Sequence, residues 1–120
     1  MHVNVQTHHV VLPSHACRDL AQRARAVLER FSGGIARIEM TLKDINGPRG
    51  GKDKECVVRA ELVDGRYIVV IDRDVSMRHS VGNALRRAKL LIANEMRRRR
   101  SRMRNGLRRH AEAPPDGLVA

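Results

Sequence analysis

Two segments with apolar residues at alternate positions limit the possible folds of this chain more than any other feature. They are residues 35–43 and 55–63. A period of two places the apolar side chains on one face of a strand, so each segment predicts a strand with one buried and one solvated face. Asp64-Gly65 predicts a two-residue hairpin turn, and residues 66–72 form its partner strand. These strands predict a sheet whose apolar face other elements must cover.

Two segments with helical spacing can supply that cover. The first is 15–31, with Ser14 as a natural N-cap. The second is roughly 76–103, with Asp74 and Ser76 as candidate N-caps. One apolar stripe runs along this second helix. The stripe consists of Val81, Ala84, Leu85, Ala88, Leu91, Ile92 and Met96.

The order of these elements defines the fold class. Residues 2–7 alternate and predict a first strand, which makes the order β-α-β-β-β-α. We therefore expect an α+β fold, a four-stranded sheet with two helices packed on one face, similar to a double-stranded-RNA-binding domain. Residues 1–104 are expected to form this domain. Residues 105–120 contain Pro114-Pro115 and show no periodicity, so we expect a flexible C-terminal tail.

Positive charge is concentrated in one part of the chain. The formal net charge is +11 in 120 residues. Residues 78–109 hold twelve Lys or Arg and a single acid, Glu95, whereas residues 1–77 hold twelve Lys or Arg and ten acids. The whole excess thus falls on the segment 78–109, which includes most of the second predicted helix. Such an excess indicates a polyanionic partner: RNA, DNA or an anionic membrane surface.

The arginine run at 97–104 bears on which polyanion is bound. Guanidinium groups pair with phosphate in a bidentate geometry and stay charged; the alternative is a solvated, charged helix end. Membrane binding is disfavoured, because the domain core needs the apolar stripe. Base stacking on aromatic rings is disfavoured as well, since Phe31 and Tyr67 are the only aromatic residues. What remains is recognition of the backbone of structured nucleic acid, and charge alone does not separate RNA from DNA.

A glycine-rich loop at 44–54 is the second basic feature. It contains Arg49, Lys52 and Lys54 on a pliable backbone. It predicts either a phosphate-contacting loop or a plain long hairpin connection. The spacing of a phosphate-binding P-loop is absent.

The remaining polar residues carry no recognisable catalytic or metal-binding pattern. His8, His9 and His15 lie near Cys17 without zinc-ligand spacing, so we expect no metal and no cofactor. Cys17 and Cys56 suit free thiols in a reducing compartment. No activated nucleophile or carboxylate pair is visible, so we expect neither an enzyme nor a small-molecule substrate. With no secretory signal and no membrane-length apolar segment, the cytoplasm is the expected location.

The loop carries a family resemblance. Residues 44–56 match Asp44, Asn46 to Gly51, Asp53, Lys54 and Cys56 of a D-x-N-G-P-[KR]-G-G-x-D-K-x-C segment. This segment resembles the ribosome hibernation promoting factor family, also called ribosome-associated inhibitor A. The element order and the basic second helix extend the resemblance over roughly residues 1–103. Long-form members add a C-terminal dimerisation domain, which this chain does not show, so it resembles the short form.

The resemblance implies a partner and a set of contacts. Family members bind the decoding region of the small ribosomal subunit, in the channel of mRNA and tRNA, and block translation during stress or stationary phase. It therefore implies an rRNA-binding translation inhibitor; the alternative is a nucleoid-type DNA-binding module. The RNA-binding residues that it implies are Arg18, Arg25, Arg49, Lys52, Lys54, Arg86, Arg87, Lys89, Arg97, Arg98 and Arg100.

Overall fold

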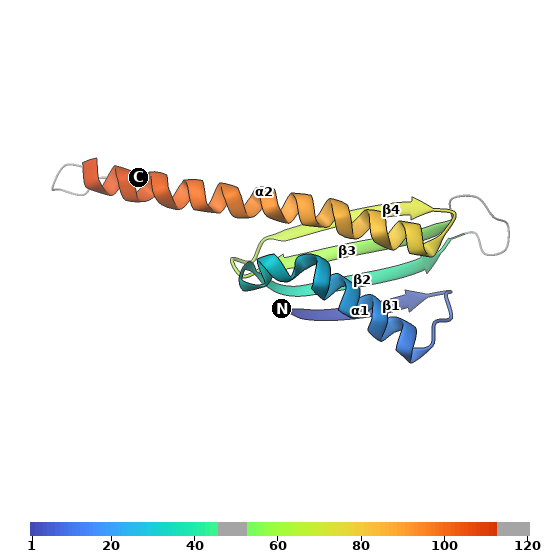
Figure 1. Ribbon diagram of the computed structural model, residues 1–120. Helices are drawn as coiled ribbons and strands as arrows, with labels where there is room; N and C mark the ends of the chain where they lie inside the picture. The colour runs from blue at the N-terminus through green and yellow to red at the C-terminus, as the bar shows by residue number, and fades with distance from the viewer. Residues whose placement is uncertain (46–52, 113–120) are drawn as a thin grey trace.

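The chain folds in the predicted order β-α-β-β-β-α (Figure 1). The computed structural model describes the backbone of residues 1–45 and 53–112, and side chains as far as residue 103. The elements are β1 (His2–His8), α1 (Ser14–Leu28), the 3-10 helix η1 (Glu29–Gly34), β2 (Ile35–Asp44), β3 (Lys54–Leu62), β4 (Tyr67–Asp74) and α2 (Met77–Glu112). The predicted α+β class is confirmed.

The four strands form one mixed sheet in the order β1-β2-β3-β4. β1 runs parallel to β2, whereas β2–β3 and β3–β4 are antiparallel. A parallel neighbour requires a crossover connection, which α1 provides. Both helices lie on the same face of the sheet, as predicted, and the other face is left open (Figure 1).

The core lies between this sheet and the two helices. The apolar positions of β2 and β3 are buried, as their alternation predicts, and Met40 and Val58 are paired across the two strands. Within the described residues, α2 contributes five buried apolar side chains. They are Val81, Ala84, Leu85, Ala88 and Ile92. The sequence also assigns Leu91 to the apolar stripe that should face the core. That prediction is wrong, because Leu91 is 45% exposed. The sheet ends at β4, so no described strand lies beneath the outer flank of the helix.

Both ends of α1 differ from the prediction. Ser14 is the first helical residue and Pro13 takes the N-cap position, where no side-chain cap bond forms. The carbonyl of Pro13 instead accepts the amides of Ala16 and Cys17 at 3.0 and 3.2 Å. The α-helix stops at Leu28 and continues as the 3-10 helix η1, because the last turn before a glycine pair readily tightens to this geometry.

The start of α2 agrees with its predicted capping residues. The carbonyl of Ser76 accepts the amide of Ser80 at 3.0 Å, so Ser76 immediately precedes the first helical turn. Asp74 Oδ1 accepts the amide of Ser76 at 3.2 Å. Together these bonds redirect the chain from β4 into the helix.

α2 is longer than predicted. It continues to Glu112, so residues 105–112 are helical rather than irregular. One interior glycine costs a helix about 1 kcal/mol relative to alanine, and the surrounding Arg, Leu and Ala residues are strong helix formers. At 1.5 Å per residue the 36 residues extend about 54 Å. The helix therefore projects well past the end of the sheet (Figure 1). The domain boundary at 104 stays a prediction, and residues 113–120 lie outside the described residues.

The turn between β3 and β4 has three residues instead of two. The amide of Leu62 donates to the carbonyl of Arg66 at 2.8 Å, and the amide of Gly65 donates to the carbonyl of Leu62 at 2.9 Å. Gly65 has φ +89°, in the left-handed region that favours glycine. A turn closed by such a residue gives the strands their right-handed twist, so Asp64-Gly65 marks the correct place but the wrong turn length.

The two cysteines should differ strongly in reactivity. Burial raises the pKa of the Cys56 thiol to about 12, with further contributions from Asp72 and Glu55, whereas Cys17 is half-buried. Since the thiolate is the reactive form, we expect iodoacetamide at about pH 8 to modify Cys17 and to spare Cys56 in the folded protein. Mass spectrometry of wild type and Cys17→Ser checks this, because the variant should take up label only after unfolding. Equal labelling of both sites in the native protein would contradict the buried position of Cys56.

Candidate nucleic-acid interface

Asp72 fixes how α2 lies against the sheet. Its carbonyl accepts Ser80 Oγ at 2.7 Å, and its carboxylate accepts Asn83 Nδ2 at 3.4 Å and lies 3.5 Å from Arg87 Nη1. Ser80 is fully buried. These contacts come from three positions on one side of the helix, so they fix its rotation. They thereby decide which cations of α2 face α1 and which face solvent.

Two hollows lie along the line where α1 and η1 face α2, and arginines from both sides line them. One lies between Arg30 and Phe31 of η1 and Arg97 and Arg100 of α2. Towards the starts of the helices, the second is lined by Arg23 and Arg78 together with Asp19 and apolar side chains. We call these two hollows the interhelical groove and define it by five cations. They are Arg23, Arg30, Arg78, Arg97 and Arg100.

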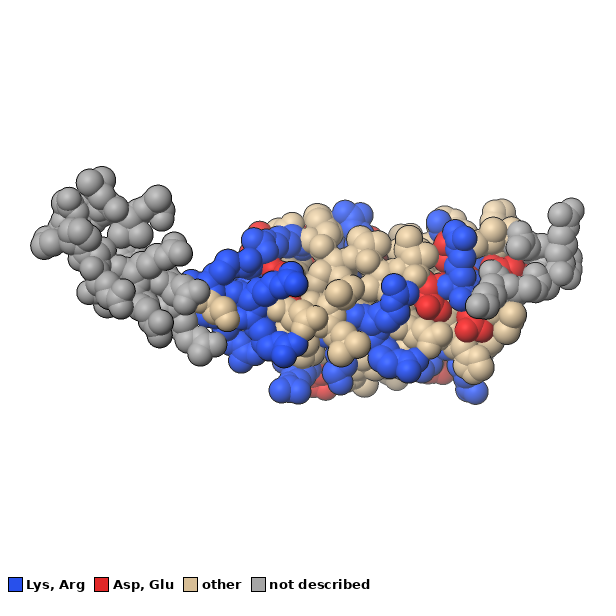
Figure 2. Space-filling view, turned by 90° about the horizontal axis from the view of Figure 1, so that it is seen from above, with Lys and Arg blue, Asp and Glu red and all other residues tan. Residues whose placement is uncertain are grey.

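Nine of the cations on the two helices and η1 have no carboxylate partner within the described residues. They are exposed, and none of them makes an ion pair there. This set comprises Arg18, Arg23, Arg25, Arg30, Arg78, Arg86, Lys89, Arg97 and Arg100. Figure 2 looks down on the edge of the molecule formed by α2 and β4 and shows a dense group of basic side chains towards one end. Arg86 and Arg97 each donate one hydrogen bond to a neighbouring asparagine, and Arg30 lies 5.8 Å from the centre of the Phe31 ring. A guanidinium group has five N–H donors, so donors remain available to phosphate.

The open face of the sheet has a different electrostatic character. Arg37 lies 3.8 and 4.0 Å from Glu39 and Glu61, and Arg73 lies 3.0 Å from Glu55. Lys43 also pairs with Glu55, and the Arg59 guanidinium stacks over Tyr67 at 4.1 Å. Each of these cations has a carboxylate that offsets its charge or an aromatic ring on which its guanidinium stacks. The attraction for a polyanion is therefore strongest on the helical side.

Several residues implied by the resemblance lie around the interhelical groove. Arg97 and Arg100 line it directly. Arg18 and Arg25 are exposed, but Arg25 lies two residues from Arg23, or about 200° around the helix, and so occupies the other flank of α1. Two others, Arg86 and Lys89, are exposed on α2. The structure therefore brings only part of the implied set together.

Three other implied residues are already engaged. Arg87 donates to the carbonyl of Ile71 at 2.9 Å and also pairs with Asp72, so it fastens α2 to the edge strand β4. Arg98 lies 3.8 Å from Glu95. Lys54 lies beside the carboxylates of Asp44 and Asp53. Arg49 and Lys52 lie outside the described residues.

The described part of the 44–56 motif closes the base of its loop. Lys54 Nζ lies 2.6 Å from Asp44 and 3.5 Å from Asp53, and the hydrogen bond to Asp44 raises the pKa of Lys54. Asp53 is buried, and its carbonyl accepts the amide of Ile45 at 2.8 Å. Cys56 lies in the core. These contacts explain why the motif needs its acidic, lysine and cysteine positions, and they leave Lys54 as the weakest candidate for phosphate binding.

The two basic features of the sequence lie at opposite ends of the sheet. The loop base lies beside the start of α2, because Lys54 pairs with Asp74 across β3 and β4. Arg97 follows Met77 by twenty residues, which is about 30 Å along a helix. A polyanion that contacts both must extend over that distance.

The sequence reasoning missed Arg23, Arg30 and Arg78. Arg23 and Arg30 are seven residues apart, which places them on one flank of the helix that the sequence predicts over 15–31, although Arg30 lies in η1 in the structure. What it does not display is which flank of α1 faces α2. A side chain added at Gly82 would come within 3.1 Å of Arg23 Nη2, so Arg23 reaches directly over α2.

Neither a metal centre nor a membrane-spanning helix is found among the described residues. No group of three or more His, Cys, Asp or Glu side chains there could hold a metal ion. The helices in that part of the chain are too polar or too short to cross a bilayer.

Comparison with known proteins places the architecture among solved structures. The chain matches no protein-family model, and no curated protein matches it by sequence. It is similar to the crystal structure of the Thermus thermophilus Protein Y N-terminal domain, with 16% identity, a TM-score of 0.61, and coverage of 77% of this chain and 96% of that one. It is also similar to a ribosomal subunit interface protein from Coxiella burnetii, with 18% identity, a TM-score of 0.63, and coverage of 80% and 98%. The chain has their fold.

The similarity to these two structures extends over the whole architecture. Both solved structures are covered almost completely, so the likeness includes the whole of each fold rather than one motif. The α+β architecture implied by the sequence resemblance is thereby confirmed. Sequence identity of this level shows a fold and not an activity.

Proposed function

We propose that this chain binds ribosomal RNA on the small ribosomal subunit and inhibits translation as a hibernation factor in the cytoplasm. The observation that supports this most is the unequal distribution of free cations. Among the described residues, nine cations of the helical side lack carboxylate partners, whereas Arg37, Lys43, Arg59 and Arg73 on the open sheet face have acidic or aromatic neighbours. The fold likeness to a protein named as a ribosomal subunit interface protein and the motif at 44–56 both favour a ribosomal partner.

Binding rather than catalysis is the basis of this proposal. Arginine donors in a groove between two rigid helices suit the phosphate backbone of folded RNA, which is recognised by shape and charge. Inhibition then follows from occupancy, because a protein seated in the decoding region excludes tRNA and mRNA. The residues proposed to contact RNA are those of the interhelical groove, joined by Arg86 and Lys89 on α2 and by Arg18 and Arg25 on the other flank of α1.

Co-sedimentation with purified small ribosomal subunits tests the proposal. We expect binding at low ionic strength that weakens steadily as salt is raised. The logarithm of affinity should fall by about 0.7 to 0.9 for each phosphate contact per tenfold increase in salt. Deacylated tRNA should compete. Absence of co-sedimentation at about 50 mM salt, where such contacts are strong, would reject the proposal.

A nucleoid-type DNA-binding role is the second candidate, because α2 carries its arginine run beyond the sheet. Comparison of a gel shift on duplex DNA with subunit pelleting, at matched salt, separates the two. We expect at least roughly tenfold preference for the subunit, or about 1.4 kcal/mol. Equal affinity would favour the DNA-binding role instead.

A further inference from the structure

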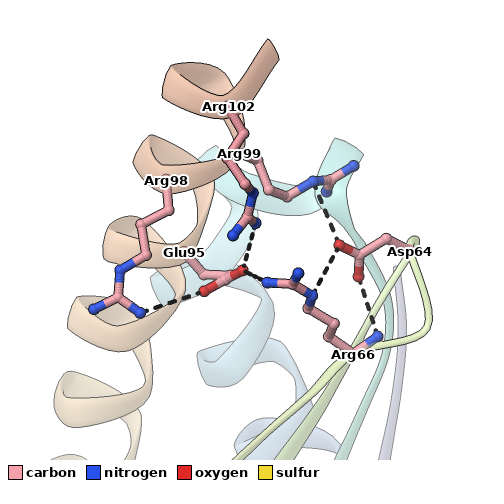
Figure 3. Close-up of polar contacts among 6 residues, drawn as sticks. All are labelled: Asp64, Arg66, Glu95, Arg98, Arg99 and Arg102. Carbon is pink, nitrogen blue, oxygen red and sulfur yellow. Dashed lines mark hydrogen bonds and ion pairs between the residues drawn. The ribbon is translucent and has the colours of Figure 1, made fainter. Parts of the chain in front are cut away.

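Glu95 is the single acid within residues 78–109, and its carboxylate lies among arginines (Figure 3). Arg66 Nη1 of the β3–β4 turn donates to it at 2.6 Å, and Arg102 Nη2 donates at 3.2 Å. Arg98 Nη1 lies 3.8 Å from its second oxygen. Although partial burial works in the opposite direction, the hydrogen bonds from Arg102 and Arg66 lower the pKa of Glu95. The carboxylate is therefore ionised at neutral pH.

Asp64 in the β3–β4 turn forms the second half of the same cluster. Its carboxylate accepts the backbone amide of Arg66 at 3.1 Å and lies 3.6 Å from Arg99 Nε. The Arg66 side chain joins the two acids, since it also lies 3.8 Å from Asp64. We call this cluster the carboxylate clamp. It consists of Asp64, Arg66, Glu95, Arg98, Arg99 and Arg102.

A close contact on another side of α2 complements the clamp. The side chain of Met96 passes directly over Gly34 of η1, where an added Cβ would lie 2.7 Å from Met96 Sδ. Any side chain at Gly34 would require Met96 to move. The helix is therefore held by the β3–β4 turn and by η1 at the point where it leaves the sheet.

Helical geometry divides the arginine segment into two faces. Arg98, Arg99 and Arg102 follow Glu95 by three, four and seven residues, which places them on its face of the helix. Arg97 and Arg100 project elsewhere and line the interhelical groove. Neighbouring arginines thus meet different surroundings: carboxylates on one face, and a groove free of ion pairs among the described residues on the other.

We propose that the carboxylate clamp assigns these two faces different roles, with Glu95 as the positioning residue. Arg98, Arg99 and Arg102 are occupied by internal carboxylates and hold the projecting helix in one direction. Arg97 and Arg100 contact phosphate. The inference rests on the proposed RNA-binding function for its second part, whereas its first part concerns the free protein alone.

The first part is tested without any ligand. Glu95→Gln keeps the shape of the side chain but removes the charge that attracts three arginines. We expect faster amide hydrogen exchange over residues 95–103 in this variant and unchanged exchange in β2 and β3. Unchanged exchange over 95–103 would overturn the role of the clamp in holding the helix.

The second part is tested with two double variants of equal charge, Arg97→Gln/Arg100→Gln and Arg98→Gln/Arg102→Gln. The first should weaken binding roughly 20-fold at about 0.15 M salt and reduce the salt slope by about 1.6, as expected for two lost contacts. The second should leave the slope unchanged and alter affinity less than about 3-fold, because these side chains contact carboxylates rather than phosphate. Equal losses in both variants would overturn the division into two faces.

Glu95→Gln gives a readout that a merely structural role would not produce. The variant frees Arg98 and Arg102 for phosphate. Its salt slope should therefore become steeper by the amount that corresponds to about 1 to 2 additional phosphate contacts, and its affinity at low salt should rise. A purely structural role predicts weaker binding without a steeper slope, and that result would overturn the proposal.

Two probes separate this inference from the proposed function: small ribosomal subunits and a short RNA duplex. If wild type shows no preference for the subunit, the ribosomal function fails, and the duplex still tests the two faces. If wild type binds neither probe at low salt, both the function and the assignment of the faces are overturned.

Discussion

Replacement of four groove arginines by glutamine is expected to weaken binding to the small ribosomal subunit by roughly 10²- to 10³-fold at about 0.15 M salt. These are Arg23, Arg30, Arg97 and Arg100. Each lost phosphate contact reduces the salt slope by about 0.7 to 0.9, so four reduce it by about 3. If wild type and variant bind equally at about 1 M salt, where these contacts are screened, the smaller slope alone gives the stated loss of affinity at about 0.15 M. Pelleting across a salt series measures both quantities.

A control with the same change in charge separates site from net charge. It replaces four cations on the open sheet face by glutamine. These are Arg37, Lys43, Arg59 and Arg73. Because acidic or aromatic neighbours already engage them, their loss should change affinity less than about 5-fold, mostly through long-range attraction. If the control weakens binding as much as the groove variant does, the interhelical groove is not the binding site.

Leu85→Ala is expected to destabilise the fold by about 2 to 5 kcal/mol. Leu85 is 1% exposed and lies where α2 meets the sheet. Its truncation removes apolar contacts and leaves a cavity that the surrounding strands fill only in part. Urea unfolding monitored by circular dichroism measures the change in the free energy of unfolding, provided that the slope of the transition is unchanged.

Leu90→Ala is the matched control for that experiment. It is the same substitution on the same helix, but Leu90 is 62% exposed. We expect a change within about 0.5 kcal/mol. Similar losses in both variants would mean that α2 is not packed in the rotation fixed by Asp72. Unchanged RNA binding by folded Leu90→Ala would also show that this exposed leucine takes no part in the interface.

Element types were predictable because local pattern and burial agree over most of the chain. The alternation in β2 and β3 and the apolar stripe of α2 each require one buried face, and no competing arrangement satisfies all three. The errors occurred where a local signal is weak. The sequence predicts Ser14 as the N-cap because its side chain suits that position. In the structure the helix begins one residue earlier than predicted, with Pro13 at the N-cap. The lack of periodicity beyond residue 104 suggested an end to α2, but the helix-forming residues there continue it to Glu112 in spite of one glycine.

The amino-acid sequence by itself determined the element order, the buried face of the sheet and the concentration of positive charge on the second helix. Those properties depend on the period of apolar residues and on charge count, which are local. Only the tertiary structure decided which arginines are free. The flank of α1 that faces α2, the pairing of Glu95 with Arg66 across 29 residues, and the engagement of Arg87 by β4 all depend on packing between distant segments. A guanidinium group attracts phosphate or is already held by carboxylate according to its neighbours in space, and those neighbours are set by the fold.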